Sequence, residues 1–475
     1  MKKLHYIAAF ALGLAAVSCD VLDKEPSNSW ESSTAIQSYD DLVYAVNGVY
    51  ESQTSAIDNG SNYRGSYAGD FTLYADMKGS DYQCLGNNNQ ATDVSRYQAT
   101  PSGSVSADNF YKRFYLSIAR VNKVLEGVKE AGLEGEDVNA QLGELYALRA
   151  LFHFDLARLF AKLPSTVDDW ENEPGIVLSL ETHDSDYIGT RSSLKATYEA
   201  IISDLGTALG YLQSATTTNN GHFNYWGALA LRARVYLYMD NCGGTDYNSL
   251  ALQDAEEVIG SGVYSLYERD DYAGVWGSEY TSESIFEIQV TSLYNPQRNS
   301  LGYYTHAEGY AEAALSTSFQ TFLNEHSGDI RSTVVATEQD GNISGTFSQK
   351  YPGRNGEIYV NNPKVIRLSE MYLIAAEAAL KANSGNAASY INQLREKRIE
   401  SYSDVSSITL DEILDERRLE LNGEGHMAWD MWRNKKSVNN PYAGEITYDD
   451  YRTVLPIPQA EINVSKGSLK QNQGY

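Results

Sequence analysis

The side chains best placed to do chemistry are tyrosines, which recur in two stretches rich in Gly, Ser, Asn and Asp. The chain has 36 Tyr against 12 Phe and 6 Trp. Tyrosine offers a flat apolar face to the C–H side of a sugar ring and a hydroxyl for hydrogen bonding. Neighbouring Asn, Asp, Gln and Arg side chains match sugar hydroxyls. This composition is typical of a surface that recognises glycans without transforming them.

Catalytic chemistry has weaker support. Acidic side chains are abundant, so paired-carboxylate glycoside hydrolysis stays open as an alternative. The densest cluster interleaves acids with two arginines on one helix, a pattern that stabilises a helix and its neighbours. Its members are Asp411, Glu412, Asp415, Glu416 and Glu420, with Arg417 and Arg418. The seven histidines show no metal-ligand spacing, and no motif for a nucleophile, a nucleotide or a cofactor occurs. We therefore expect no catalysis, no cofactor and no metal.

The net charge of −26 argues against nucleic-acid binding, because an acidic surface repels phosphate backbones. Cys84 and Cys242 are the two cysteines beyond the start of the chain. An exported protein could join them in a disulfide, but spacing cannot establish the bond, and two free thiols are the favoured interpretation.

The first residues resemble an export leader. Lys2 and Lys3 precede an apolar segment too short to span a bilayer, and residues 16–19 read Ala-Val-Ser-Cys. This pattern predicts a lipoprotein signal peptide at 1–18 and a mature chain that begins with an acylated Cys19. Several acyl chains would make a durable membrane anchor. A plain secretory signal with an incidental cysteine is the alternative.

Helices must position the tyrosine-rich stretches. Apolar periodicity predicts a first helix at 39–51, a pair between about 110 and 163, and further helices at 192–215, 224–240 and 246–261. From 367 to 434 come three or four more, one of them apolar nearly all round and one opened by a capping box at Thr409 and Glu412. Such helix pairs joined by short turns are the units of a helical-repeat array.

The two tyrosine-rich stretches lie between these helices, at 54–107 and 263–365. Neither shows a sustained helical period, although residues 285–290 favour a short strand. We expect irregular inserts on a helical frame, which is a scaffold that carries a site built from loops.

Several motifs, in this order and spacing, resemble the SusD/RagB family of outer-membrane nutrient-binding lipoproteins of Bacteroidetes. They are the helix Arg367–Glu377, the run Glu416-Arg417-Arg418-Leu419-Glu420-Leu421, Asp430-Met431-Trp432-Arg433, Leu455-Pro456-Ile457-Pro458 and the closing Gln471-Asn472-Gln473-Gly474-Tyr475. The resemblance covers essentially the whole mature chain. It implies an all-α SusD-like fold: a scaffold of about four tetratricopeptide-like helix pairs with irregular loop-rich inserts.

The resemblance also implies the domain organisation. Residues 19–475 would form one SusD-like domain. Its parts would be an N-terminal region at 19–260, an irregular ligand-side insert at 263–365 and a C-terminal region at 366–475. The acidic residues after Cys19 resemble the tag that displays such lipoproteins on the outer cell face. The implied partner is a SusC-like TonB-dependent outer-membrane barrel, over which the protein sits as a lid.

In this family the ligand surface is built from the loop segment after the first helix and from the insert that follows the middle repeats. The corresponding residues here are about 76–100 and 290–310. The expected ligand-binding residues are Tyr82, Asn87, Tyr97, Tyr294, Arg298, Tyr303 and Tyr304. Oligosaccharides are the favoured ligand. Peptide binding by the same fold, a surface glycosidase and a purely structural tetratricopeptide adaptor are the alternatives.

Overall fold

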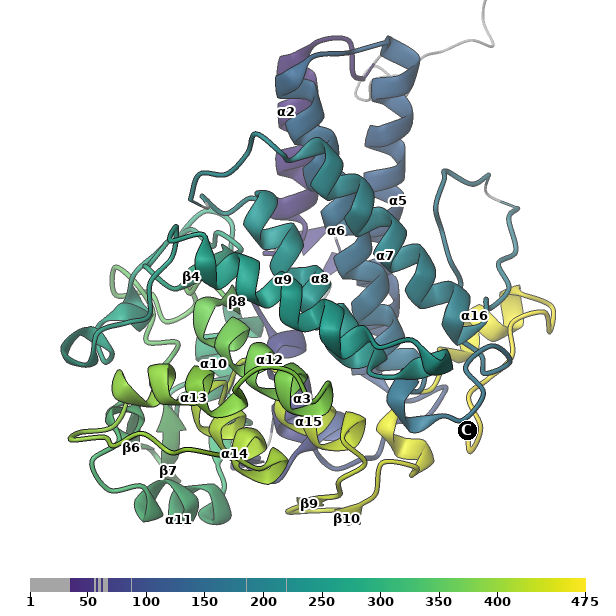
Figure 1. The fold of residues 1–475 in the computed structure, drawn as a ribbon. Coiled ribbons are helices and arrows are strands. Elements are labelled where there is room, and N and C mark those ends of the chain that lie inside the picture. The colour runs from purple at the N-terminus through teal and green to yellow at the C-terminus, as the bar shows by residue number, and fades with distance from the viewer. Residues whose placement is uncertain are drawn as a thin grey trace, which may run out of the picture.

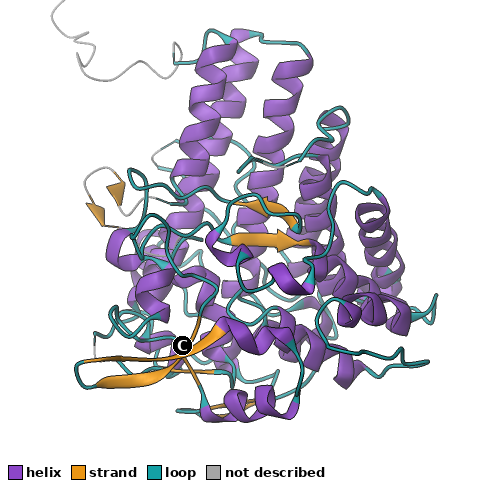
Figure 2. Cartoon of the chain, turned by 90° about the vertical axis from the view of Figure 1, so that its left-hand side faces the viewer, coloured by secondary structure: helices purple, strands orange, loops and turns teal. Residues whose placement is uncertain are grey.

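The structure, a computed structural model, describes residues 35–54, 57–58, 61–62, 67–86, 88–184, 186–218 and 220–475. Helices form about half of this part, and strands occur as short pairs (Figure 2). The predicted leader at 1–18 and Cys19 lie outside the described residues. Within the described ranges, no helix combines the length and apolar character that a membrane crossing requires.

A continuous array of helices forms the frame (Figure 1). Its members are α2 (Tyr39–Glu51), α5 (Val105–Ala131), α6 (Glu136–Phe160), α7 (Leu194–Tyr211), α8 (Tyr225–Met239), α9 (Tyr247–Gly260), α12 (Leu368–Lys381) and α13 (Ala387–Glu396). Helix α2 contacts α5 and α6, and each member from α5 onward contacts the next one. The predicted all-α fold class is confirmed, whereas the tetratricopeptide-like character of the pairs stays a prediction.

The C-terminal helices form where the sequence predicts them. Helix α12 is buried on nearly every side, and Met371, Leu373 and Ile374 have no exposed surface. Helix α14 (Leu410–Glu420) opens with the expected capping box. The Thr409 hydroxyl accepts the Glu412 N–H, and the Glu412 carboxylate accepts the Thr409 N–H at 2.8 Å. Two backbone donors that the helix itself leaves free are thereby satisfied.

Shorter elements lie beside and below this array (Figure 1). The helices among them are α3 (Asp70–Lys78), α4 (Thr92–Ser95), α10 (Leu301–Thr305), α11 (Thr317–Glu325), α15 (Met427–Arg433) and α16 (Gln459–Val464). The antiparallel strand pairs are β1 (Ile57–Asp58) with β2 (Ser61–Asn62), β3 (Tyr82–Gln83) with β5 (Ala314–Leu315), β4 (Ser284–Glu287) with β8 (Lys364–Arg367), β6 (Val335–Asp340) with β7 (Ile343–Ser348), and β9 (Val438–Asn440) with β10 (Gly444–Ile446).

The two inserts are more regular than the sequence predicts. The expectation of irregular structure throughout 54–107 is wrong at α3, in which every residue except Thr72 is buried. A helix enclosed on all sides lacks the 3.6-residue alternation that reveals an amphipathic helix. In 263–365 the predicted strand is present as β4, ending at Glu287, and is joined by α10, α11 and the β6–β7 hairpin.

A network of fully buried charges joins the second insert to the C-terminal helices. The side chains of Glu283, Arg367, Arg398 and Glu420 have no exposed surface. Arg367 lies 2.7 Å from Glu283 and 3.1 Å from Glu420. Arg398 bridges the same two carboxylates. Each charge has lost its water, so it depends on its partners for compensation.

Replacing Glu420 by Gln should destabilise the fold strongly, because Arg331, Arg367 and Arg398 would lose a buried carboxylate that all three contact. The expected loss in free energy of unfolding is about 3–5 kcal/mol, measured by urea titration. The exposed Asp411→Asn on the same helix is the matched control and should change it by less than about 0.5 kcal/mol. Equal losses in both variants would show that the buried network does not support the fold.

The same network gives a pH dependence. Burial alone would raise the pKa of Glu420, but Arg398, Arg367 and Arg331 hold it well below its usual value. A carboxylate with a lowered folded-state pKa stabilises fully above the unfolded value of about 4.3 and loses this contribution as the pH falls further. Unfolding midpoints measured across the acid range should therefore fall less steeply in Glu420→Gln than in the unmodified chain.

Candidate functional site

The structure joins the two inserts that the sequence predicts to form the ligand surface. Strand β3 of the first insert pairs with β5 of the second, with Tyr82 opposite Leu315. Immediately after β3, the Leu85 and Gly86 N–H groups donate to the Ala311 carbonyl at 2.9 and 3.1 Å. Backbone hydrogen bonds thus fix residues 82–86 against residues 311–315, although more than 200 residues separate them along the chain.

A buried carboxylate extends this junction. Glu312 is 1% exposed and accepts the Gln90 N–H at 2.9 Å and the Ala91 N–H at 2.6 Å. Hydrogen bonds to an ionised acceptor are among the stronger ones in proteins. The side chain of the second insert therefore holds the backbone of the first just after its asparagine run.

Close approach at the junction requires a glycine. A Cβ added to Gly86 would overlap the Tyr310 carbonyl oxygen. The two backbones therefore meet here without a side chain between them, and Tyr310 is fixed beside Tyr303 with ring centroids 5.5 Å apart.

We use the term loop surface for the solvent-accessible side chains on the two joined inserts: Asn88, Asn89, Tyr294, Arg298, Tyr303 and Tyr310. Tyr294 is 45% exposed, Arg298 and both asparagines are exposed, and Tyr303 and Tyr310 are half-buried. The short helix α10, between Arg298 and Tyr310, contacts α3 and so ties this segment to the interior. Aromatic faces, two amides and a guanidinium make a surface that can stack on rings and exchange hydrogen bonds with hydroxyls.

Three of the expected ligand-binding tyrosines lie in the interior. Tyr82 is 1% exposed and donates its hydroxyl to the Asn422 side chain. Tyr97 donates to the Lys78 carbonyl, and the Lys78 ammonium lies 3.6 Å from the centroid of its ring. Tyr304 has no exposed surface. The prediction that these three rings stack on a ligand is at odds with their burial.

The remaining expected residues divide into two groups. Tyr294, Arg298 and Tyr303 are accessible on the second insert, and their role in binding stays a prediction. Asn87 lies outside the described residues. Sequence reasoning did not single out Tyr310 or Glu312. The cluster of tyrosines around Gly302 could have pointed to Tyr310, whereas a buried acid that accepts backbone amides leaves no local pattern.

Two carboxylates of the acidic cluster on α14 are buried in ion pairs, whereas Asp411, Glu412 and Asp415 are exposed. Glu416 is buried against Arg331 at 2.6 Å, and Glu420 lies in the charge network described above. Across the ranges that the structure describes, no three His, Cys, Asp or Glu side chains are grouped to hold a metal ion. Cys84 and Cys242 are free thiols, as the favoured interpretation expects.

Glu312→Ala should loosen the junction between the inserts, because two backbone N–H groups would lose a charged acceptor. Amide hydrogen exchange at Gln90 and Ala91 should become about 10- to 100-fold faster, with little change in the helical array. Glu308→Ala, at an exposed site in the same insert, is the control. Unchanged exchange at Gln90 and Ala91 would mean that Glu312 does not hold this segment.

Two family models match the chain. Residues 298–475 match the model described as the SusD family. Residues 20–237 match the model described as starch-binding associating with outer membrane. The two matches lie on either side of α9 and β4, and together they contain every residue of the loop surface except Tyr294, which lies between them.

Similar proteins extend over nearly the whole chain. The SusD-like protein P2 of Formosa agariphila is 25% identical, and the match covers 100% of both sequences. A SusD superfamily protein from Bacteroides thetaiotaomicron is 29% identical with a TM-score of 0.83, covering 92% of this chain and 99% of its own. Surface glycan-binding protein A from Bacteroides thetaiotaomicron, solved with laminarihexaose, shares the fold at 19% identity and a TM-score of 0.73, covering 91% and 99%.

Proposed function

The chain belongs to the SusD family, and we propose that it captures oligosaccharides at the cell surface without transforming them and hands them to a SusC-like TonB-dependent outer-membrane barrel. The observation that carries this proposal is the loop surface, where aromatic and amide side chains are accessible on two inserts joined by backbone hydrogen bonds. The description of the model matched by residues 20–237, starch-binding associating with outer membrane, supports a carbohydrate ligand.

In this proposal the ligand lies across the second insert. Tyr294 and Tyr303 stack on sugar rings, with Tyr310 packed beside Tyr303. Arg298 donates to ring hydroxyls, and Asn88 and Asn89 add donors and acceptors from the first insert. Because Glu312 and the β3–β5 pair already hold the backbone, little conformational entropy would be lost when a sugar binds.

The same loop surface would also serve the transfer of the bound oligosaccharide to the barrel. A bound oligosaccharide that contacts the receptor and the barrel together would favour their closed arrangement by its higher affinity for that state. Opening and closing would then deliver the sugar without covalent chemistry. The mature chain, residues 19–475, would act as one SusD-like domain held to the membrane through lipid on Cys19 and facing the cell exterior.

Titration calorimetry of protein that starts at Asp20, against laminarihexaose, maltohexaose, xylohexaose and a mixed peptide pool, tests the ligand class. We expect saturable heat with one glycan class and about tenfold weaker binding in each of Tyr294→Ala and Tyr303→Ala, since each loses a stacking face. Tyr44→Ala, an exposed tyrosine on α2, is the control and should bind as the unmodified chain does.

Other outcomes of this titration would contradict the proposal in distinct ways. Saturable binding of peptides alone would identify a peptide receptor of the same fold. New reducing ends after incubation with the glycans would reveal a glycosidase. Binding of neither class would favour a structural adaptor.

Cys19→Ala should release the protein from the outer membrane, because the predicted lipid attachment atom is its sulfur. Fractionation of the native host, with Cys84→Ala as the control cysteine, measures this directly. The expected result is loss of the Cys19 variant from the outer-membrane fraction and retention of the control. Retention of both variants in that fraction would show that the anchor lies elsewhere.

A further inference from the structure

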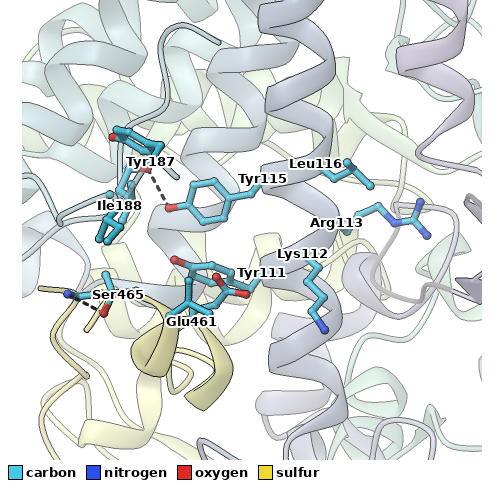
Figure 3. A pocket seen from close by; sticks show the side chains of 13 residues that line it. Tyr111, Lys112, Arg113, Tyr115, Leu116, Tyr187, Ile188, Glu461 and Ser465 are labelled. Atoms are coloured by element: carbon cyan, nitrogen blue, oxygen red, sulfur yellow. Dashed lines mark hydrogen bonds between the residues drawn. The ribbon is translucent and has the colours of Figure 1, made fainter. Parts of the chain in front are cut away.

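A pocket of about 430 Å³ lies between the first half of α5, the loop at 177–189 and α16 (Figure 3). Its lining shares no residue with the loop surface, and it is built from different elements. Helix α5 supplies one wall and the loop the opposite one, while α16 and the residues after it close one side. The carbohydrate role proposed above does not use this pocket.

The walls of the pocket are aromatic and aliphatic. The rings of Tyr111 and Tyr115 stand next to each other on α5, with centroids 4.6 Å apart. The Tyr115 hydroxyl donates to the Val177 carbonyl at 2.9 Å, which ties α5 to the loop and fixes this ring. Leu116, Val177 and Leu469 add aliphatic surface. The floor is therefore pre-formed and does not depend on a ligand for its shape.

The rim of the pocket presents apolar side chains to solvent. Tyr187 is 47% exposed and Ile188 41%. The Tyr187 ring stacks on His183 with centroids 3.7 Å apart and an angle of 2° between the planes, so its orientation is held although it lies on a loop. Val464 of α16 is 69% exposed across the opening. Exposed apolar side chains gathered around one opening are typical of a binding site.

One carboxylate lines the pocket, that of Glu461. Glu461 projects from α16, and its side chain lies beside the Tyr111 ring (Figure 3). Among the residues that the structure describes, no hydrogen bond or ion pair to this carboxylate is formed. Burial raises the pKa of Glu461, while Lys112 lowers it and Asp108 raises it. A carboxylate half removed from water gains most from ligand groups that can donate hydrogen bonds to it.

We propose that the pocket is a second carbohydrate subsite, which holds one sugar residue with its C–H face against the tyrosine rings and its hydroxyls donating to Glu461. This proposal rests on the proposed carbohydrate role but places binding in a separate part of the molecule. A cyclic polyol matches the two requirements of the pocket, since one face is apolar and the edge carries donors. The volume suits a compact ligand.

A second subsite would change how long glycans are held. A polymer that reaches both the loop surface and the pocket binds at the second place as an intramolecular event, so its affinity rises without new contacts at the first. A short oligosaccharide gains nothing from the second subsite. The ratio of polymer to hexamer affinity therefore reports on the pocket.

The first test is nuclear magnetic resonance of protein labelled with ¹³C-tyrosine, with pocket signals assigned through Tyr111→Phe, Tyr115→Phe and Tyr187→Phe. Glucose, galactose, mannose, xylose and N-acetylglucosamine serve as probes at high millimolar concentration. At least one sugar should shift the pocket tyrosine signals. Glu461→Gln should weaken this effect about tenfold, the size of a lost charged acceptor, and the exposed Glu445→Gln on β10 should leave it unchanged. Shifts from none of the sugars would overturn the proposal.

The same spectra separate this proposal from the proposed function. Shifts at Tyr294 and Tyr303 with silent pocket signals would overturn the second subsite and leave the loop surface standing. Pocket shifts that survive Tyr303→Ala and disappear in Tyr187→Ala would support two independent places. Pocket shifts with a silent loop surface would support the subsite while overturning the ligand contacts proposed for the second insert. Tyr187→Ala should also reduce the affinity for the polymer of the bound glycan class more than that for its hexamer.

Discussion

The rest of the structure depends on four charged side chains that touch no water. Glu283 stands at the start of β4, Arg367 at the end of β8, Arg398 just after α13, and Glu420 at the end of α14. Each would be costly to bury alone, so each is tolerable only while the others keep their places. The insert and the C-terminal helices are thereby fixed relative to each other more strictly than apolar contacts alone would require, since apolar surfaces can slide and charges in a dry network cannot. Because the second insert carries part of the loop surface, the charge network also fixes the position of that surface.

Nearer the surface, carboxylates that accept hydrogen bonds from backbone N–H groups also fix segments of the chain relative to each other. Glu312 holds residues 90 and 91, and Asp76 of α3 accepts the N–H groups of Gly425 and Met427. Burial raises the pKa of Asp76 to about 7 although these amides lower it. Loops that would have many conformations alone are thus ordered by single carboxylates of the two inserts. Tyr294, Arg298, Asn88 and Asn89 are exposed to solvent on the inserts, where a ligand can reach them.

The sequence predicts the frame well and the site only in part, for physical reasons. Helices such as α12 and α14 carry their own signals, in the apolar run around Met371 and the capping pair Thr409 and Glu412, because those signals arise from neighbouring residues. Helix α3 carries no such signal, because the buried polar residues Asp70, Asp76 and Lys78 interrupt its apolar residues. For tyrosines, the sequence does not reveal which are buried. Tyr82, Tyr97 and Tyr304 lie in the interior, whereas Tyr294 and Tyr303 reach the surface. The residue type is the same in both settings, and only long-range packing separates them.

The pairing of β3 with β5 has a consequence for how the molecule comes into being. Gln83 and Leu315 meet across a sequence separation of 232 residues, so this contact belongs to the slow, non-local part of folding. A chain that has been synthesised only as far as α9 can form helices from local contacts. It lacks the second insert and therefore the loop surface. The two inserts are therefore joined only after residues 311–315 have been made, so a chain that ends before them lacks the surface proposed to bind sugars.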